Sequence, residues 1–550
     1  MTMTQLTGGQ ALVQSIKREG IETIFGLPGV QLDWAFDALY DERDSIKVYH
    51  TRHEQATAYM ADGYARSTGR VGACLVVPGP GLLNASAALS TAYACSSQVL
   101  CLTGQIQSDL IGVGRGLLHE IPYQLEMLRS VTKWAARAMR PAEIPGLVRE
   151  AFVQLRSDRA RPVALEIPPD VLAATEEVQL LDPASAQRER SAGDPDLLKR
   201  AAQALARAQR PLIFVGSGIF QSEAWDELRE LAEALQAPVV MSSNGRGALS
   251  DRHYLAQNTL AGMRLLPDAD VVLAVGTRFL QPATSWGLPA GATTIQIDVD
   301  PAEVGRNAKP TIGIVADAKA ALTALLAGID GANGKRPSRE AELQALKEEV
   351  ADLLFEVQPQ ASYTDVLRKA LPDDGVLVSE MTQVGYFANV GFPVYEPRTY
   401  ITPGYQGTLG YGFATALGVQ VGNPEKKVIS INGDGGFGYN LQELSTVKAH
   451  DINVVAVVFS DGAYGNVKRI QQQSFNGRTI ASDLTNPDWV KLAESFGVAG
   501  MRARTPDELA GALREALATN GPVLIDAPVA PMPSMWHLTN PSRAATAARR

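Results

Sequence analysis

The stretch that decides the fold is Lys427-Val-Ile-Ser-Ile-Asn-Gly-Asp-Gly-Gly-Phe-Gly-Tyr-Asn440, an apolar run that ends in glycines. Its Gly433, Gly435 and Gly438 have the G-x-G-x-x-G spacing of dinucleotide-binding loops, in which glycines let the backbone approach a pyrophosphate. An aspartate, Asp434, interrupts this loop and would repel a phosphate. The apolar run predicts a strand of a parallel sheet that is covered on both faces. The aspartate needs a separate explanation.

The same pattern of an apolar strand followed by a helix-like segment recurs along the whole chain. The predicted strands cover residues 22–26, 71–77, 99–104, 162–168, 211–216, 238–242, 270–276, 294–299, 375–379, 427–431, 453–459 and 523–527. The predicted helices include residues 11–18, 224–235, 409–421 and 441–449. This alternation predicts an α/β protein with doubly wound parallel sheets.

Length and composition divide the chain into blocks. Its 550 residues are enough for about three or four domains. Polar, Pro-rich or Gly-rich composition predicts linkers near residues 180–195 and 328–338. We therefore predict α/β domains over residues 1–180, 195–330 and 355–530. The segment 531–550 is either a lid over a site or a disordered tail, and composition favours the tail for its final ten residues.

Charge and cysteine content exclude several classes of function. The net charge of −9, without a stripe of Lys and Arg, argues against a nucleic-acid partner. No apolar run approaches the ~20 residues of a membrane span, and the N-terminus does not resemble a signal peptide, so we expect a cytoplasmic enzyme with small-molecule ligands. Cys74, Cys95 and Cys101 lack the number and spacing of a disulfide framework or a zinc site, and we interpret them as core thiols.

A metal ion would explain Asp434. The next predicted strand ends at Ser460-Asp461, and Asp461 lies 27 residues after Asp434, farther than the ~20 residues typical of a nicotinamide site. Carboxylates at the ends of neighbouring parallel strands face one crevice. There Mg²⁺ could bridge both to a diphosphate held by the amides of Gly435 and Gly436. On residue chemistry alone another interpretation stays open: Asp434 could cap a helix that starts near Tyr439, and Asp461 could belong to a turn.

A family resemblance favours the metal site. Gly433-Asp-Gly435, followed at this distance by Ser460-Asp461-Gly-Ala-Tyr-Gly-Asn-Val467, resembles the signature of thiamine-diphosphate-dependent enzymes of the acetolactate synthase type. That family also includes pyruvate and benzoylformate decarboxylases and benzaldehyde lyase. The resemblance implies a pyrimidine-binding, a central and a diphosphate-binding domain, and Mg²⁺ held by Asp434, Asp461 and the carbonyl of Ala463. Asp461 departs from the family pattern, which usually has Asn there.

The resemblance also implies which residues contact thiamine diphosphate. Residues 52–56, Arg-His-Glu-Gln-Ala, resemble the segment with the family's indispensable glutamate, so we expect a buried Glu54 to hydrogen-bond the aminopyrimidine ring and promote loss of the thiazolium C2 proton. Leu409 would lie between the two rings of the cofactor, and the Gly407 carbonyl would accept from its 4′-amino group. The other implied cofactor contacts are Thr382, Gln383, Gly433, Gly435, Gly436, Tyr464 and Gly465.

The sequence signals for substrate-side groups and for a second cofactor are less specific. Gln31 and His119 lie in stretches that resemble loops near the thiazolium, which makes them candidate catalytic residues, with loop shaping as the alternative. The middle block resembles the domain that binds FAD in biosynthetic acetolactate synthases. The region after residues 244–247 lacks the Gly-Met pattern expected for flavin contact, so we favour a structural domain over an FAD site.

The sequence thus predicts a thiamine-diphosphate- and Mg²⁺-dependent enzyme that decarboxylates a 2-oxo acid and joins the remaining fragment to a second carbonyl acceptor. The alternatives are a 2-oxo acid decarboxylase and a benzaldehyde-lyase-like enzyme. An NAD-dependent oxidoreductase or a cofactor-binding protein without catalysis would leave Glu54 unused. Since Glu54 and the diphosphate site come from different subunits in the family, we expect at least a homodimer, and a homotetramer as in many relatives.

Overall fold

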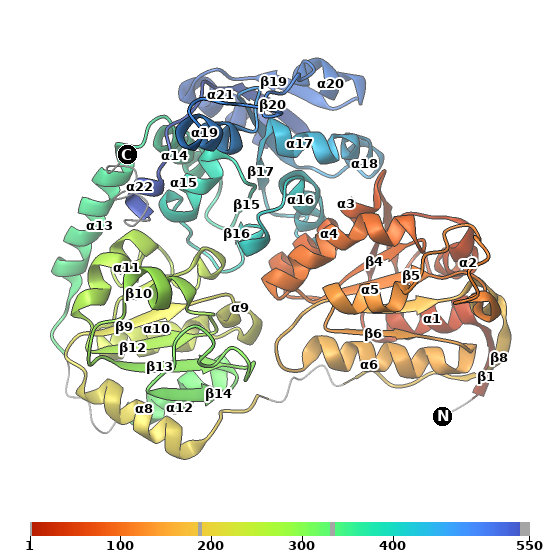
Figure 1. The fold of residues 1–550 in the computed structure, drawn as a ribbon, viewed down its shortest axis with the longest axis horizontal. Helices are drawn as coiled ribbons and strands as arrows, with labels where there is room; N and C mark the ends of the chain where they lie inside the picture. Colours follow the sequence, from red (N-terminus) through yellow and green to blue (C-terminus); the bar gives the residue numbers. More distant parts are fainter. Residues whose placement is uncertain (1–2, 185–189, 330–335, 540–550) are drawn as a thin grey trace.

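The computed structural model describes residues 3–184, 190–329 and 336–539, and these form three six-stranded sheets flanked by helices (Figure 1). Every strand pair within these three sheets is parallel. In each sheet the chain reverses its direction of winding near the middle. The predicted α/β fold with doubly wound parallel sheets is therefore confirmed.

The first sheet has the strand order β3-β2-β4-β5-β7-β6. Its strands are β2 (Thr23–Gly26), β3 (Lys47–His50), β4 (Gly72–Val76), β5 (Val99–Gly104), β6 (Trp134–Arg137) and β7 (Val163–Ile167). The helices around it are α1 (Gly8–Arg18), α2 (Asp33–Asp41), α3 (Glu54–Thr68), α4 (Pro80–Cys95), α5 (Gln124–Val131), α6 (Ile144–Arg156) and α7 (Pro169–Ala173). An antiparallel pair, β1 (Met3–Thr7) and β8 (Thr175–Gln179), which the sequence analysis missed, joins the two ends of this block.

The second sheet has the order β11-β10-β9-β12-β13-β14. Its strands are β9 (Pro211–Val215), β10 (Val239–Met241), β11 (Ala256–Gln257), β12 (Val271–Val275), β13 (Thr293–Asp298) and β14 (Ile312–Val315). Its helices are α8 (Pro195–Arg207), α9 (Gly218–Ser222), α10 (Trp225–Leu235), α11 (Thr259–Leu265) and α12 (Ala318–Ile329). The helix α13 (Glu340–Phe355) then runs along one side of the molecule to the third block (Figure 1).

The third sheet has the order β16-β15-β17-β18-β20-β19. Its strands are β15 (Val376–Ser379), β16 (Tyr400–Ile401), β17 (Val428–Gly433), β18 (Val455–Ser460), β19 (Ala499–Arg502) and β20 (Val523–Pro528). Its helices are α14 (Gln360–Ala370), α15 (Gln383–Gly391), α16 (Tyr411–Gly422), α17 (Asp434–Asn440), α18 (Leu444–Ala449), α19 (Gly465–Ser474), α20 (Trp489–Ser495) and α21 (Pro506–Ala518).

The twelve predicted strands are the four inner strands of each sheet, and the six edge strands were missed. Inner strands such as β12 are buried along their whole length, which requires a continuous apolar run. Edge strands are short or partly exposed, as in β3 and β19, so their sequences carry no such signal. Three helix starts also differ by two or more residues: α1 begins at Gly8, α16 begins at Tyr411, because Gly410 has a left-handed conformation (φ 81°), and a short 3₁₀ turn over Leu441–Glu443 precedes α18.

Two glycine-mediated helix contacts join the first and third blocks. Helix α3 crosses α16 so closely that a Cβ added at Gly63 would overlap the carbonyl of Thr415, and one at Gly418 would overlap the carbonyl of Met60. Tyr411 of α16 also donates a hydrogen bond to Asp62 of α3 (3.2 Å). These contacts hold the carboxyl edges of the two sheets in a fixed relation.

The described part of the C-terminal segment is packed rather than extended. Met535 is buried, and Trp536 at the start of α22 (Trp536–Thr539) packs against Tyr386 of α15, with ring centroids 5.2 Å apart and ring planes tilted by 51°. Residues 531–539 are therefore not a disordered tail, because apolar burial holds them. The prediction for the final ten residues lies outside the described residues, as do parts of both predicted linkers, 185–189 and 330–335.

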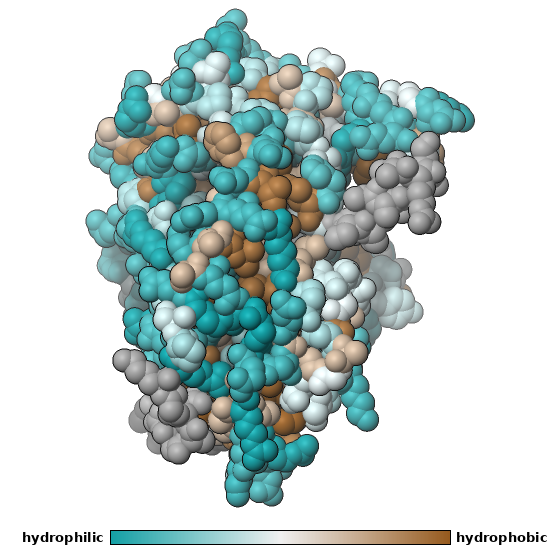
Figure 2. All heavy atoms as spheres, turned by 90° about the vertical axis from the view of Figure 1, so that its left-hand side faces the viewer, coloured by the Kyte–Doolittle hydropathy of each residue, from teal (hydrophilic) through white to brown (hydrophobic). Residues whose placement is uncertain are grey.

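Surface and core features agree with the composition. Cys74, Cys95 and Cys101 are free and buried, as predicted. Within the described residues, no helix is long and apolar enough to cross a membrane. The face that carries α13 is mostly hydrophilic, with hydrophobic side chains gathered near its middle (Figure 2).

Candidate active site

The carboxyl ends of three neighbouring strands, β15, β17 and β18, bring together the residues predicted to bind the diphosphate and the metal. Thr382 and Gln383 follow β15, where Thr382 is the N-cap residue of α15. Gly433 ends β17, and the nearest atom to a Cβ built there would be Cβ of Thr382, 3.8 Å away. This edge is where open parallel sheets bind ligands.

Asp434 is buried at the first position of α17, so it does not cap a helix that starts near Tyr439. Its carboxylate accepts hydrogen bonds from the amide of Gly435 (2.9 Å), the amide of Gly462 (2.8 Å) and Nδ2 of Asn486 (2.6 Å). Burial raises its pKa despite these three donors. The side chain is therefore fixed in place between the loops that follow β17 and β18.

Asp461 is half-buried beside it, in the loop after β18. Its Oδ1 accepts the amide of Ala463 (3.1 Å), and a Cβ at Gly465 would overlap its other oxygen, Oδ2. Burial, and then the charge of Asp434, raise the pKa of Asp461. The ring of Tyr464 packs against Gly435 so closely that a Cβ on this glycine would overlap it.

The carboxylate oxygens of Asp434 and Asp461 are suitable ligands for a hard cation. Two neighbouring carboxylates that disfavour each other's charge become compatible once a divalent ion binds both, and Mg²⁺ prefers oxygen ligands of this kind. No cluster of three or more His, Cys, Asp or Glu that could hold a metal occurs among residues 3–184, 190–329 and 336–539. A metal here would therefore take its remaining ligands from a backbone carbonyl such as that of Ala463, from water and from the diphosphate.

The segment before α16 forms a tight turn beside this cluster. Gly407 (φ 56°) and Gly410 (φ 81°) both have left-handed backbones, which glycine adopts without strain. Between them Leu409 is only partly buried. A Cβ at Gly407 would lie 3.2 Å from Cε of Met381. The turn thus presents a half-exposed leucine next to the residues that follow β15.

Glu54, Gln31 and His119 gather around the loop 78–81 at the carboxyl edge of the first sheet. His119 Nδ1 lies 2.9 Å from Oε1 of Gln31, and Nε2 of Gln31 donates to the carbonyl of Leu118 (3.1 Å). Glu54 is the first residue of α3, and Asn84 donates from Nδ2 to its Oε2 (3.0 Å). Gln31 is buried, whereas His119 is partly exposed.

The single chain does not reproduce the buried Glu54 that was predicted. Glu54 is partly exposed, and its carboxylate receives no hydrogen bond from the third block within the described part of the chain. The chain therefore divides the predicted site into two groups, one at the first sheet and one at the third.

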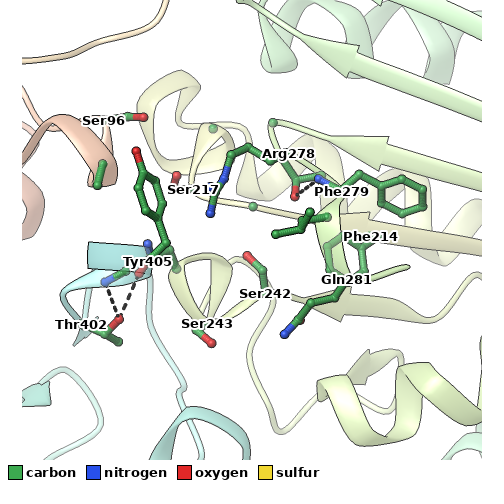
Figure 3. Close-up of a pocket in the computed structure, with 18 of the residues that line it drawn as sticks. Ser96, Phe214, Ser217, Ser242, Ser243, Arg278, Phe279, Gln281, Thr402 and Tyr405 are labelled. Carbon is green, nitrogen blue, oxygen red and sulfur yellow. Dashed lines mark hydrogen bonds between the residues drawn. The ribbon is translucent and has the colours of Figure 1, made fainter. Parts of the chain in front are cut away.

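A cavity of about 480 Å³ lies at the carboxyl edge of the second sheet and extends to the third block. Serines and glycines after β9, β10 and β12 line it, and Figure 3 shows the Arg278 side chain extending toward the ring of Tyr405. The Arg278 guanidinium lies 4.2 Å from the centroid of the Tyr405 ring. At its other end the cavity reaches Glu380, Met381 and Asn466, beside the metal and diphosphate cluster. Its volume is typical of small-molecule sites.

Two residues of this region were missed in the sequence. Asn486, which contacts Asp434, lies in a loop far along the chain, and no local pattern marks it. Glu380 immediately follows β15 and is buried. It stands at a strand end as Asp434 and Asp461 do, so the same reasoning could have identified it.

Comparison with known families identifies each block. Three family models of thiamine pyrophosphate enzymes match the chain: the N-terminal TPP binding domain at residues 6–127, the central domain at 198–325, and the C-terminal TPP binding domain at 380–527. These matches cover the whole second sheet and most strands of the first and third, and they include the loops with the candidate residues.

Curated relatives are similar over nearly the full length. A probable acetolactate synthase large subunit of Methanocaldococcus jannaschii is 36% identical, covering 96% of this chain and 92% of its own. A probable 2-ketoarginine decarboxylase of Pseudomonas aeruginosa is 33% identical, covering 95% and 94%. An acetolactate synthase of Arthrospira platensis is 32% identical, also covering 95% and 94%.

Proposed function

The chain belongs to the thiamine pyrophosphate enzyme family, and on that premise we propose that it is an acetolactate-synthase-like carboligase. It would decarboxylate a 2-oxo acid and join the remaining acyl fragment to a second carbonyl compound. The observation that carries the proposal is the pair of neighbouring carboxylates, Asp434 and Asp461, beside the glycine loop after β17. Two of the three relatives described above are named as acetolactate synthases, which supports carboligation.

The residues would divide the work as follows. Asp434, Asp461 and the Ala463 carbonyl would hold Mg²⁺. The diphosphate would contact a second set of groups, namely Thr382, Gln383, Gly433, Gly435, Gly436, Tyr464 and Gly465. When bound, thiamine diphosphate supplies a thiazolium that accepts the electrons left behind when CO₂ departs.

On the pyrimidine side, Leu409 would hold the bent conformation of the cofactor and the Gly407 carbonyl would orient its amino group. Glu54 would hold a proton at the pyrimidine ring, and Gln31 with His119 would orient the substrate carbonyl or move a proton there. The 2.9 Å contact between His119 and Gln31 supports a joint role, since each holds the other's side chain.

The site would need two copies of the chain. Glu54 of one copy would face the Asp434 group of another, and large apolar side chains beside both groups are exposed in the single chain. On the first block these are Val30, Leu83, Leu118 and Tyr123, and on the third Tyr439, Val467, Ile470, Phe475 and Ile480. Exposed apolar surface of this extent usually marks an interface. A homodimer is therefore proposed as the minimum, with a homotetramer as the larger assembly, in the cytoplasm.

Mixing two inactive variants tests the shared site. Glu54→Gln and Asp434→Asn should each be inactive alone, yet coexpressed chains should regain about a quarter of the wild-type activity, because half of the dimers are mixed and each has one intact site. Absence of any recovery in mixed dimers verified by mass spectrometry would mean that both groups act within one chain.

The reaction itself is tested by product analysis. Protein stripped with EDTA should release no CO₂ from pyruvate, and addition of both thiamine diphosphate and Mg²⁺ should restore release and give a 2-hydroxy-3-oxo acid product by mass. A simple decarboxylase is the second candidate, because one relative is named as a 2-ketoarginine decarboxylase. Formation of only an aldehyde, from pyruvate or from 2-ketoarginine, would favour that candidate.

The cavity at the second sheet bears on FAD. The sequence analysis favoured a structural central domain, and a flavin would have to fit beside Arg278 and Tyr405. A visible absorption spectrum of the purified protein without bands near 370 and 450 nm, which are about the positions of oxidised flavin, would support the structural role.

A further inference from the structure

Glu380 is an acidic side chain that the proposed mechanism does not use, although it lies at the centre of the third block's loops. It follows β15 directly, its backbone amide pairs with the carbonyl of Ile431 (3.0 Å) next to β17, and it is 2% exposed. Most other buried acids have a basic partner: Glu19 pairs with Arg156, for example. Among the described residues Glu380 has no such ion pair. Its partners are backbone amides.

These amides belong to the turn that carries Leu409. The Gly410 amide donates to Oε1 of Glu380 (2.7 Å), and the Gly412 amide donates to Oε2 (3.3 Å). On its other side the Gly410 peptide is also fixed, because its carbonyl accepts a hydrogen bond from Nδ2 of Asn440 (2.6 Å) at the end of α17. One carboxyl group thus holds two amides, those of Gly410 and Gly412, at the start of α16.

The same carboxyl group packs against the glycine loop after β17. A Cβ added at Gly436 would overlap Oε1 of Glu380, and one added at Gly412 would lie 3.0 Å from Oε2. Glu380 therefore fills the space between the turn before α16 and the proposed diphosphate loop. Any displacement of its side chain would move both segments relative to each other.

We propose that Glu380 is a positioning residue that sets the turn 407–412 in register with the glycine loop 433–436, so that one buried side chain fixes the two segments of the third block that are proposed to contact the aminopyrimidine ring and the diphosphate. This inference rests on the proposed function. Without the carboxyl group the amides of Gly410 and Gly412 would lose their acceptors, and an unsatisfied buried amide disfavours the observed turn.

The protonation state of Glu380 is compatible with an anion bound beside it. Burial raises its pKa to about 8, even though the Gly410 and Gly412 amides favour ionisation. At neutral pH the side chain is then a neutral acid that still accepts a hydrogen bond through its carbonyl oxygen. It adds no negative charge beside a loop proposed to hold a diphosphate.

Two variants of nearly equal volume separate the hydrogen-bond acceptor from packing. Glu380→Gln keeps a carbonyl oxygen, and Glu380→Leu removes it. We expect the Leu variant to weaken binding of thiamine diphosphate, measured by titration calorimetry with Mg²⁺ present, by about tenfold or more, and to lower kcat at saturating cofactor. The Gln variant should stay within about threefold of the wild type in both.

A matched control removes another buried carboxylate far from the site. Glu19 accepts the amide of Ala184 (2.7 Å) and pairs with Arg156 in the first block. Glu19→Leu should lower Tm but leave cofactor affinity and kcat unchanged. A loss of cofactor affinity in this control equal to that in Glu380→Leu would overturn the proposal, because general destabilisation would then explain both.

Hydrogen–deuterium exchange of the cofactor-free protein tests whether Glu380 holds the turn, independently of cofactor binding and catalysis. The peptide over residues 404–412 should exchange faster in Glu380→Leu than in the wild type, and at the wild-type rate in Glu380→Gln and Glu19→Leu. If the Leu variant does not fold, Glu380→Asp replaces it, since its shorter side chain draws the carboxyl away from Gly410.

The outcomes separate a failure of the positioning role from a failure of the proposed function. If wild-type protein does not bind thiamine diphosphate, the proposed function fails whatever the exchange data say. If it binds and Glu380→Leu binds equally well, or if Glu380→Gln binds as weakly as Glu380→Leu, the positioning role fails and the proposed function stands.

Discussion

The two groups of candidate residues, one at the first sheet and one at the third, differ in how completely a single chain builds them. At the third sheet Asp434 and Glu380 are buried and held by backbone amides from several loops. At the first sheet Glu54 is partly exposed and has one side-chain partner, Asn84. One half of the proposed site is therefore preorganised within the chain, whereas Glu54 in the other half remains partly exposed.

The largest expected effect tests the exposed half. Glu54→Gln should lower kcat by about 100-fold or more, the range of general acid–base catalysis, because an amide cannot exchange a proton with the pyrimidine ring. Cofactor affinity should change little, since the third block makes most of the proposed contacts. Stopped-flow measurement of hydrogen exchange at C2 of the bound cofactor checks the step directly.

A matched surface variant controls that experiment. Glu22→Gln changes an exposed glutamate of the same block that pairs with Arg70, and it should leave kcat unchanged. Wild-type exchange at C2 in Glu54→Gln would contradict the assigned role.

The next effect tests the preorganised half. Asp434→Asn should weaken Mg²⁺-dependent cofactor binding by about 100-fold or more, because a charged oxygen ligand is lost from a small, strongly hydrated ion. Asp461→Asn should retain binding within about threefold, because an amide oxygen can still coordinate the ion. In the apo protein Asp461→Asn also removes a carboxyl group whose pKa is raised by burial and then by the charge of Asp434. Calorimetric titrations at several Mg²⁺ concentrations compare the two, and equal losses would be inconsistent with their proposed difference.

Substitution of Leu409 should have a smaller effect, on kcat rather than on Tm, because this side chain is proposed to contact the cofactor. Leu409→Ala should lower kcat about tenfold with little change in Tm, since the side chain is only partly buried in the chain. Val315→Ala, at a more exposed position on the edge strand β14, should change neither quantity. A drop in Tm of several degrees for Leu409→Ala would indicate a core role instead.

The last effect concerns pH and stability rather than catalysis. The folded-state pKa of Glu380 is raised to about 8 from an ordinary value near 4.5, so between these pH values the folded chain binds more protons than the unfolded chain. Its contribution therefore falls as pH rises through this window and is constant above it. Cofactor-free Glu380→Gln should lack this pH-dependent contribution to stability. Between about pH 5 and pH 8 the Tm of the wild type should therefore fall relative to the Tm of the variant. Parallel Tm curves would rule out this titration.

The sequence was informative wherever burial left a continuous apolar run. It identified the four inner strands of every sheet, and through them the strand ends at Asp434 and Asp461, because an inner strand buried on both faces tolerates few polar residues. The edge strands, the β1–β8 pair and the contact from Asn486 escaped it, since these depend on residues far apart along the chain. Glu380 escaped for a different reason: the family resemblance implied Thr382 and Gln383, just after it, as the cofactor contacts.

What the sequence determined by itself is the α/β class, the three blocks and the family, because these follow from local apolar periodicity and from short motifs at strand ends. Only the tertiary structure decided that Glu380 joins two glycine segments, that Gln31 meets His119, and that Glu54 stays half-covered in one chain. The two hydrogen bonds join residues 30 and 88 positions apart along the chain. Such contacts are set by packing between helices and sheets, as where α3 crosses α16, and no local pattern encodes them.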